Sequence, residues 1–176
     1  MEHSLRFSSA ITALVNAFYN ETLAKGNCAA CAVGNMVAFA NGAKLDPDLN
    51  SVSIHKFGKE LRNTDWKYFG MTIANRDSQL KRSYLEYCSI EESDAEQIEL
   101  AQIVTLATGY SEEEILRIEH AFETNTKIDF MQYTSSTKES IMLDQYNGLM
   151  AVVDVLCEIE GIESSNTKEL FVLNTI

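Results

Sequence analysis

Apolar residues recur at helical spacing through much of the chain. Near the N-terminus, one set follows the spacing i, i+4, i+7, i+8, i+11: Phe7, Ile11, Leu14, Val15 and Phe18. This spacing predicts one apolar face of a helix, which we expect to end in a left-handed cap at Gly26. A second helix is expected to start at Asn27, whose side chain can cap it, and to continue to about Asn41.

The second half of the sequence carries the strongest helical signals. Ser111 followed by Glu114 is typical of a capping box, in which each side chain accepts a backbone N–H from the other residue. Residues 137–160 form the longest periodic stretch, and Gly161 is placed to end it. Its apolar positions are Leu143, Tyr146, Leu149, Met150, Val152, Val153, Leu156, Cys157 and Ile159. Such a helix is apolar nearly all round, so we expect it to be buried at the centre of the fold.

The middle of the chain gives weaker signals. Residues 76–88 have helical spacing, and a further helix is expected to start at Ser93 or Asp94 and to stop at Gly109. Residues 50–75 are rich in β-branched and aromatic side chains, which allows either a short hairpin or short helices.

The predicted fold is mainly α. We expect a single helical domain over residues 1–176, with six or seven helices around the buried central helix near 137–160 and a short hairpin allowed within 50–75. A chain of 176 residues with 45% apolar residues can bury a core without disulfides or metals.

The charge narrows the classes of partner. Asp and Glu number 26 against 14 Lys and Arg, which gives a net charge of −12. A negative field repels nucleic acids and anionic membranes, so we expect neither, and it favours a basic protein partner. There is no secretory signal, no run of roughly 20 apolar residues, and no regular spacing of the four cysteines. We therefore expect a cytoplasmic protein with reduced thiols.

Familiar catalytic motifs are missing. The sequence contains no G-x-G-x-x-G, G-x-x-x-x-G-K-[ST], G-x-S-x-G or H-E-x-x-H. A non-enzymatic role is therefore favoured over an enzyme.

The stretch GNCAACAVGNM holds the one candidate for chemistry. Cys28 and Cys31 are three residues apart, so in a helix capped by Asn27 both would lie in the first turn and on one face. Unpaired amides and the helix dipole favour a thiolate there. Three interpretations stay open: the small residues allow close helix packing, the pair binds zinc, or the pair cycles between dithiol and disulfide.

A zinc site would need more ligands than the pair supplies. Structural zinc takes four, and thiolates in a reduced compartment select for it. The remaining ligands would come from His55, from Cys88, or from the same cysteine pair of the other protomer in a homodimer.

Four stretches together resemble a known family. AFYNETL, CAACAVGN, GYSEEEILRIEHAFE and YNGLMAVVDVLCEIEGI are similar, in this order, to motifs of a family of small uncharacterised bacterial and phage-encoded proteins. Some members are labelled as the flavoprotein component of a sodium-translocating NADH:quinone reductase. This chain lacks the membrane span, the four clustered cysteines and the flavin and nicotinamide sites which that label implies. The resemblance supports Cys28, Cys31 and Asn35 as one unit and supplies no reaction.

Two functional hypotheses follow. The first is a soluble, non-enzymatic binding or accessory protein, related to phages or mobile elements, that acts through contacts with another protein. The alternative is a zinc-binding or thiol-redox protein that uses Cys28 and Cys31.

Overall fold

A computed structural model describes residues 3–26, 30–40, 105 and 107–172. These residues contain five α-helices and one 3-10 helix: α1 (Leu5–Tyr19), α2 (Ala32–Ala40), α7 (Glu112–Asn125), η2 (Phe130–Ser135), α8 (Lys138–Glu160) and α9 (Ser165–Lys168). Within this part of the chain the only pairing of extended backbone is an isolated bridge between Lys25 and Asp129. The predicted mainly α fold is confirmed. The helix at 76–88, the start at Ser93 or Asp94 and the hairpin within 50–75 fall outside the described residues.

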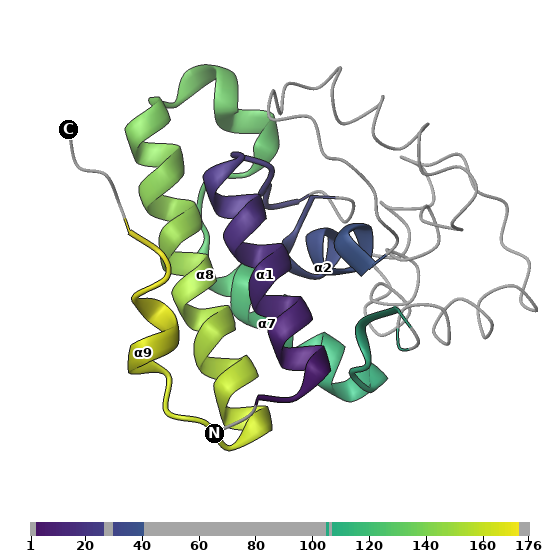
Figure 1. The fold of residues 1–176 in the computed structure, drawn as a ribbon. Coiled ribbons are helices and arrows are strands. Elements are labelled where there is room, and N and C mark those ends of the chain that lie inside the picture. Colours follow the sequence, from purple (N-terminus) through teal and green to yellow (C-terminus); the bar gives the residue numbers. More distant parts are fainter. Residues whose placement is uncertain (1–2, 27–29, 41–104, 106, 173–176) are drawn as a thin grey trace, which may run out of the picture.

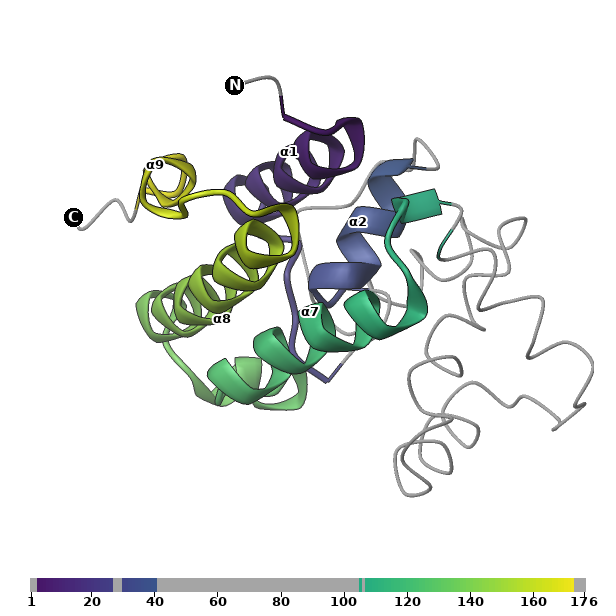
Figure 2. The same ribbon diagram turned by 90° about the horizontal axis from the view of Figure 1, so that it is seen from below.

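Four helices enclose the core. α1 contacts α2, α2 contacts α7, α7 contacts α8, and α8 returns to α1. Figure 2 shows these four helices around one interior, and in Figure 1 the short α9 lies along the outside of α8. Tyr19 at the end of α1 ties down the segment after α9, because its hydroxyl donates to the Leu170 carbonyl and accepts from the Val172 N–H.

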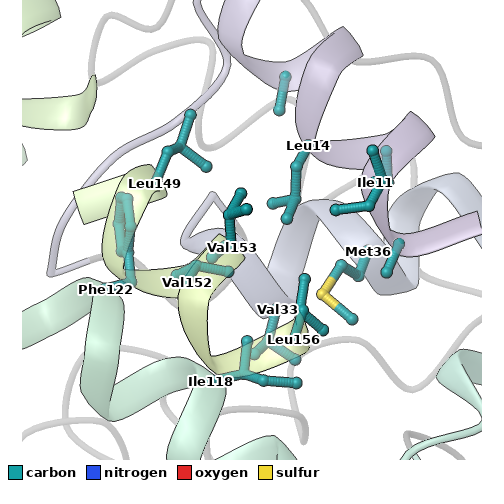
Figure 3. Packing of buried hydrophobic residues seen from close by; sticks show 14 of the residues in the cluster. Ile11, Leu14, Val33, Met36, Ile118, Phe122, Leu149, Val152, Val153 and Leu156 are labelled. Atoms are coloured by element: carbon teal, nitrogen blue, oxygen red, sulfur yellow. The ribbon is translucent and has the colours of Figure 1, made fainter. Parts of the chain in front are cut away.

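The core draws side chains from all four helices. Figure 3 shows them converging: Ile11 and Leu14 from α1, Val33 and Met36 from α2, Ile118 and Phe122 from α7, and Leu149, Val152, Val153 and Leu156 from α8. The helical face predicted for α1 is therefore confirmed. None of the helices in the described residues is long and apolar enough to cross a bilayer.

The strongest sequence signals give the observed helix ends. Ser111 Oγ accepts the N–H of Glu114 at 3.2 Å, and the Glu114 carboxylate accepts the N–H of Ser111 at 2.7 Å, so the capping box is confirmed. α8 matches the predicted central helix and ends at Gly161 in a left-handed conformation. Gly109, the expected stop of a helix, also has a positive φ and follows the helical residue Thr108.

One position of the predicted apolar stripe on α8 is exposed, and Tyr146, Met150 and Ile159 are only partly buried. Leu143 is 52% exposed, whereas Leu149 and Val153 are fully buried. Leu143 lies at the edge of the buried face, near the start of the helix. Further along, α9 reaches this edge of α8, where Thr167 contacts Cys157. Apolar residues on nearly all sides of α8 thus reflect that different neighbouring elements cover different turns of this helix.

The first helix ends earlier than expected, and without a glycine. α1 stops at Tyr19, and the left-handed residue is Glu21, with a φ of 57°. The N–H of Thr22 reaches the Ala17 carbonyl and that of Glu21 reaches Phe18, the hydrogen-bond pattern of a Schellman motif. Gly26 does have a positive φ, but a Cβ there would lie 2.1 Å from an oxygen of Asp129. The glycine is thus favoured both by its left-handed backbone and by the close approach of the Asp129 side chain.

Close approach also explains Gly148 in the middle of α8. A Cβ at this position would lie 2.4 Å from Cγ2 of Thr126 and 2.9 Å from Cδ2 of Phe122. α7 and α8 therefore cross at a distance that only glycine permits at residue 148.

Removing the hydroxyl of Ser111 should destabilise the protein. We expect Ser111→Ala to lower the free energy of unfolding by roughly 0.5–2 kcal/mol, because the N–H of Glu114 loses its acceptor. Denaturant unfolding measures this, with Ser8→Ala on the exposed face of α1 as control. Equal losses in the two variants would show that the cap does not stabilise α7.

Adding a methyl group at Gly148 should force α7 and α8 apart. We expect Gly148→Ala to cost about 1–3 kcal/mol of unfolding free energy, although alanine is the better helix former. The control is Asn147→Ala at the neighbouring position, which should change stability by less than about 0.5 kcal/mol. A stabilised Gly148→Ala protein would contradict the close crossing.

Candidate functional site

Of the residues predicted to form a site, the structure describes Cys31. Cys28, His55 and Cys88 lie outside the described residues, and so does Asn27. In the part of the chain that is described, no three or more His, Cys, Asp or Glu side chains gather where they could hold a metal ion. The zinc site built from Cys28, Cys31 and His55 or Cys88 therefore stays a prediction.

Cys31 lies directly before the second helix. α2 begins at Ala32, so the prediction that Cys31 sits inside the first turn of a helix starting near residue 27 is wrong. The reason is a competing set of hydrogen bonds. The carbonyl of Ala30 accepts the N–H of Ala24 at 2.8 Å and the side chain of Asn35 at 2.9 Å, so the backbone at residue 30 is held in a turn.

The buried side chain of Asn35 organises this turn. Its Nδ2 donates to the carbonyls of Thr22, Ala30 and Cys31 at 2.9–3.2 Å, and its Oδ1 accepts the Thr22 hydroxyl at 3.0 Å. Asn35 is 1% exposed. One amide thus joins the segment after α1 to the start of α2, which supports the grouping of Asn35 with the cysteine motif.

The sulfur of Cys31 occupies the place of a helix cap. The Cys31 carbonyl accepts the N–H of Asn35, and Sγ accepts the N–H of Gly34 at 3.3 Å. A serine or aspartate oxygen usually takes this bond at a helix N-terminus. The N–H donor and the helix dipole act to stabilise negative charge on this sulfur, whereas its complete burial acts in the opposite direction.

A carboxyl group from α7 lies against this thiol. Glu119 is only 5% exposed and hydrogen-bonds with the side chain of Cys31 and the backbone N–H of Val33, while its Oε2 has no hydrogen-bond partner. Burial, the larger cause, and the nearby Glu123 together raise the pKa of Glu119 from its usual 4.5 to about 8. At neutral pH this carboxyl is therefore largely protonated.

The end of α7 holds the segment that precedes the cysteines. The Lys25 ammonium donates to the carbonyls of Glu123 and Thr126, and the N–H of Gly26 donates to Oε1 of Glu123 at 3.3 Å. Burial raises the pKa of Glu123 as well, although Gly26 and Lys25 partly offset this. Two acidic side chains one turn apart on α7 thus face the start of α2 and the residues before it.

Comparison of the chain with protein-family models, curated proteins and solved structures found no match. The function is therefore inferred from the chemistry of these residues.

Glu119 is a site residue that the sequence did not predict. Its neighbours Ile115, Ile118 and Phe122 follow helical spacing, and all three are buried. Residue 119 falls between them at i+4 from Ile115 and i−3 from Phe122, which places it on the same face. The signal in the sequence was an acidic residue at a position where the helical spacing predicts a buried apolar one. Cys157, expected to be a small core residue, is buried at 1% exposure.

Glu119 should make stability depend on pH. The folded protein holds a proton at Glu119 more tightly than the unfolded chain, so unfolding is favoured as the pH rises from about 5 to about 8. Over this range the parent should lose on the order of 3 kcal/mol of unfolding free energy, since one pKa unit corresponds to about 1.4 kcal/mol. We expect the Glu119→Gln protein not to show this loss. Denaturant unfolding at several pH values measures it. Glu113→Gln on the exposed side of α7 should keep the slope of the parent; the same slope in the Glu119→Gln protein would contradict the buried carboxyl.

Proposed function

We propose that the protein is a thiol–disulfide protein in which Cys31 and Cys28 cycle between two thiols and one disulfide. The observation that carries this proposal is the position of Cys31: its sulfur is fully buried, accepts a backbone N–H at the start of α2 and lies beside Glu119. A thiol that serves only for packing needs neither an N–H donor nor a carboxyl group.

The C-x-x-C spacing supplies the second sulfur. Cysteines three residues apart can join in a disulfide within one turn, and the pair at 28 and 31 has this spacing. Exchange requires that one sulfur reacts with an incoming disulfide and that the other then closes the ring. The complete burial of Cys31 suits the closing role, which needs no access from outside.

The cycle can be followed in one peptide. Trypsin cuts after Lys25 and Lys44 and releases residues 26–44, which contain Cys28 and Cys31 and no other cysteine. After equilibration in glutathione buffers of increasing potential and acid quench, mass spectrometry should show this peptide losing its two thiol hydrogens at one midpoint. If no internal disulfide forms in any buffer, the proposal fails.

Metal analysis of the same preparation distinguishes the zinc hypothesis from the disulfide proposal. Protein purified without a metal-affinity step should contain little zinc under our proposal. About one zinc per chain, with a melting temperature that falls on chelation, would instead support metal binding by the pair.

A second proposal is an accessory role with a basic protein partner, in the cytoplasm of a cell that carries the phage or mobile element. The net charge of −12 favours it, together with the acidic first turn of α7 (Glu112, Glu113 and Glu114). Cross-linking in such cells should then recover a basic protein whose complex dissociates near 1 M salt, where the screening length is about 3 Å. Recovery of acidic partners, or a complex insensitive to salt, would count against it.

A further inference from the structure

We propose that the segment after α8 is a displaceable strap, and that it covers a docking surface for a basic peptide with an aromatic anchor. The C-terminal strap is residues 162–172, which include α9, and α9 lies along the outside of α8 (Figure 1). This inference rests on the second proposed function, the contact with a basic protein partner, and it assigns a surface to that contact. The strap itself shows which side chains the surface accepts.

One aromatic side chain anchors the end of the strap. Phe171 is buried, and its ring lies edge-on against Phe18 of α1, with 5.9 Å between the ring centroids. Phe18 also contacts the ring of Tyr146 on α8, at 6.1 Å. The aromatic contacts therefore continue from α8 through α1 to the strap. Leu170 and Val172, on either side of the anchor, are half exposed.

A carboxylate on α8 receives the polar groups of the strap. Asp154 accepts the Lys168 ammonium at 2.7 Å and the Ser164 hydroxyl at 2.8 Å. Lys168 stands three residues before Phe171 in the sequence. The covered surface thus accepts a cation and, three residues later, an aromatic ring.

Tyr19 holds the backbone of the strap beside the anchor. Its hydroxyl donates to the carbonyl of Leu170 at 3.0 Å and accepts the N–H of Val172 at 3.1 Å. These two bonds involve no side chain of the strap. Any peptide with the same spacing of cation and ring could therefore make them in its place.

The remaining attachments of the strap are weak. It follows Gly161, which is left-handed and where a Cβ would meet nothing within 4 Å in the described residues. α9 has four residues, and so short a helix has no stability of its own. The buried Thr167 hydroxyl accepts only the weak S–H donor of Cys157, at 3.8 Å. The ion pair with α8 lies at the surface, where such pairs contribute little. Release of the strap therefore depends mainly on Phe171.

Charge favours a basic partner over a second copy of the chain. The strap of another copy would present the same lysine and phenylalanine, but each chain has a net charge of −12, so two copies repel each other. The strap also carries Glu163 and Glu169 close to its lysine. A partner with basic residues at these places would keep both anchoring groups and be attracted by the field of the chain.

The test uses two fluorescent peptides and the full chain. One peptide has the sequence of residues 162–172, and the other carries Glu163→Lys and Glu169→Lys, which makes it basic. Fluorescence anisotropy measures their binding to the parent and to Phe171→Ala, whose own strap has lost its anchor. A closed strap lowers the apparent affinity by the fraction of open chains, so we expect the basic peptide to bind Phe171→Ala roughly 10- to 100-fold more tightly than the parent. Leu170→Ala removes the exposed neighbour and should bind like the parent.

Two further variants keep the test decisive. If Phe171→Ala fails to fold, Lys168→Ala takes its place, because it removes the exposed cation of the strap and leaves the covered surface intact. We expect it to bind the basic peptide about 2- to 5-fold more tightly than the parent, as the loss of a surface ion pair predicts. The basic peptide with its own Phe171→Ala change should bind neither chain.

The outcomes keep this inference apart from the proposed function. Equal binding to the parent and to the weakened variants, or binding by the peptide that lacks its phenylalanine, would overturn the strap and leave the basic partner to the cross-linking experiment. No binding of the basic peptide to any variant would overturn the docking surface. Equally tight binding of the unchanged peptide to Phe171→Ala would overturn the preference for a basic occupant and indicate exchange of straps between two copies. Failure of the cross-linking experiment alone, with peptide binding as expected, would overturn the accessory role in cells.

Discussion

The carboxamide of Asn35 determines where α2 begins. By donating to the carbonyls of Thr22, Ala30 and Cys31, it satisfies groups that a longer helix would have used itself. The Ala30 and Cys31 carbonyls also accept backbone N–H groups, whereas for the Thr22 carbonyl the amide is the donor seen in the described residues, and a buried carbonyl left without a donor would cost about 1–3 kcal/mol. The amide therefore fixes the turn before α2, and this turn places Cys31 at the cap instead of inside the helix. The contact between Cys31 and Glu119 depends on that placement.

The position of Glu119 in turn depends on how α7 packs. Its neighbours Ile118 and Phe122 enter the shared core, and Phe122 is one of the groups that require glycine at residue 148 on α8. With α7 held this closely, the carboxyl group cannot turn toward solvent without disturbing the core. A buried carboxyl costs stability, and a group whose pKa is shifted this far by burial is a candidate for function.

Local signals in the sequence predicted a good part of this fold. The capping box at Ser111 and the stop at Gly161 depend on residues within one turn of each other, so their pattern could be read directly. The start of α2 could not be predicted in this way, because it depends on the hydrogen bonds of the Asn35 side chain to Thr22, which the local pattern does not reveal. Glu119 was missed because a single acidic residue on an apolar face has no meaning until its neighbour across the interface is known. Cys28 and Cys31 were predicted as one unit for close packing, zinc binding or redox chemistry, and the neighbour of Cys31 on α7 came only from the structure.

The attachment of Lys25 to the end of α7 has a consequence for motion. The ammonium group holds the Glu123 and Thr126 carbonyls, and Gly26 holds the Glu123 side chain, so the segment leading to the cysteines is fastened to the last turn of that helix. Fraying of this turn and release of the segment are therefore one cooperative opening. Amide hydrogens near Asn125 and near Ala24 should then exchange with solvent at a common rate, although they lie far apart in the chain. Access from solvent to the buried side chain of Cys31 would then be governed by the stability of a helix end.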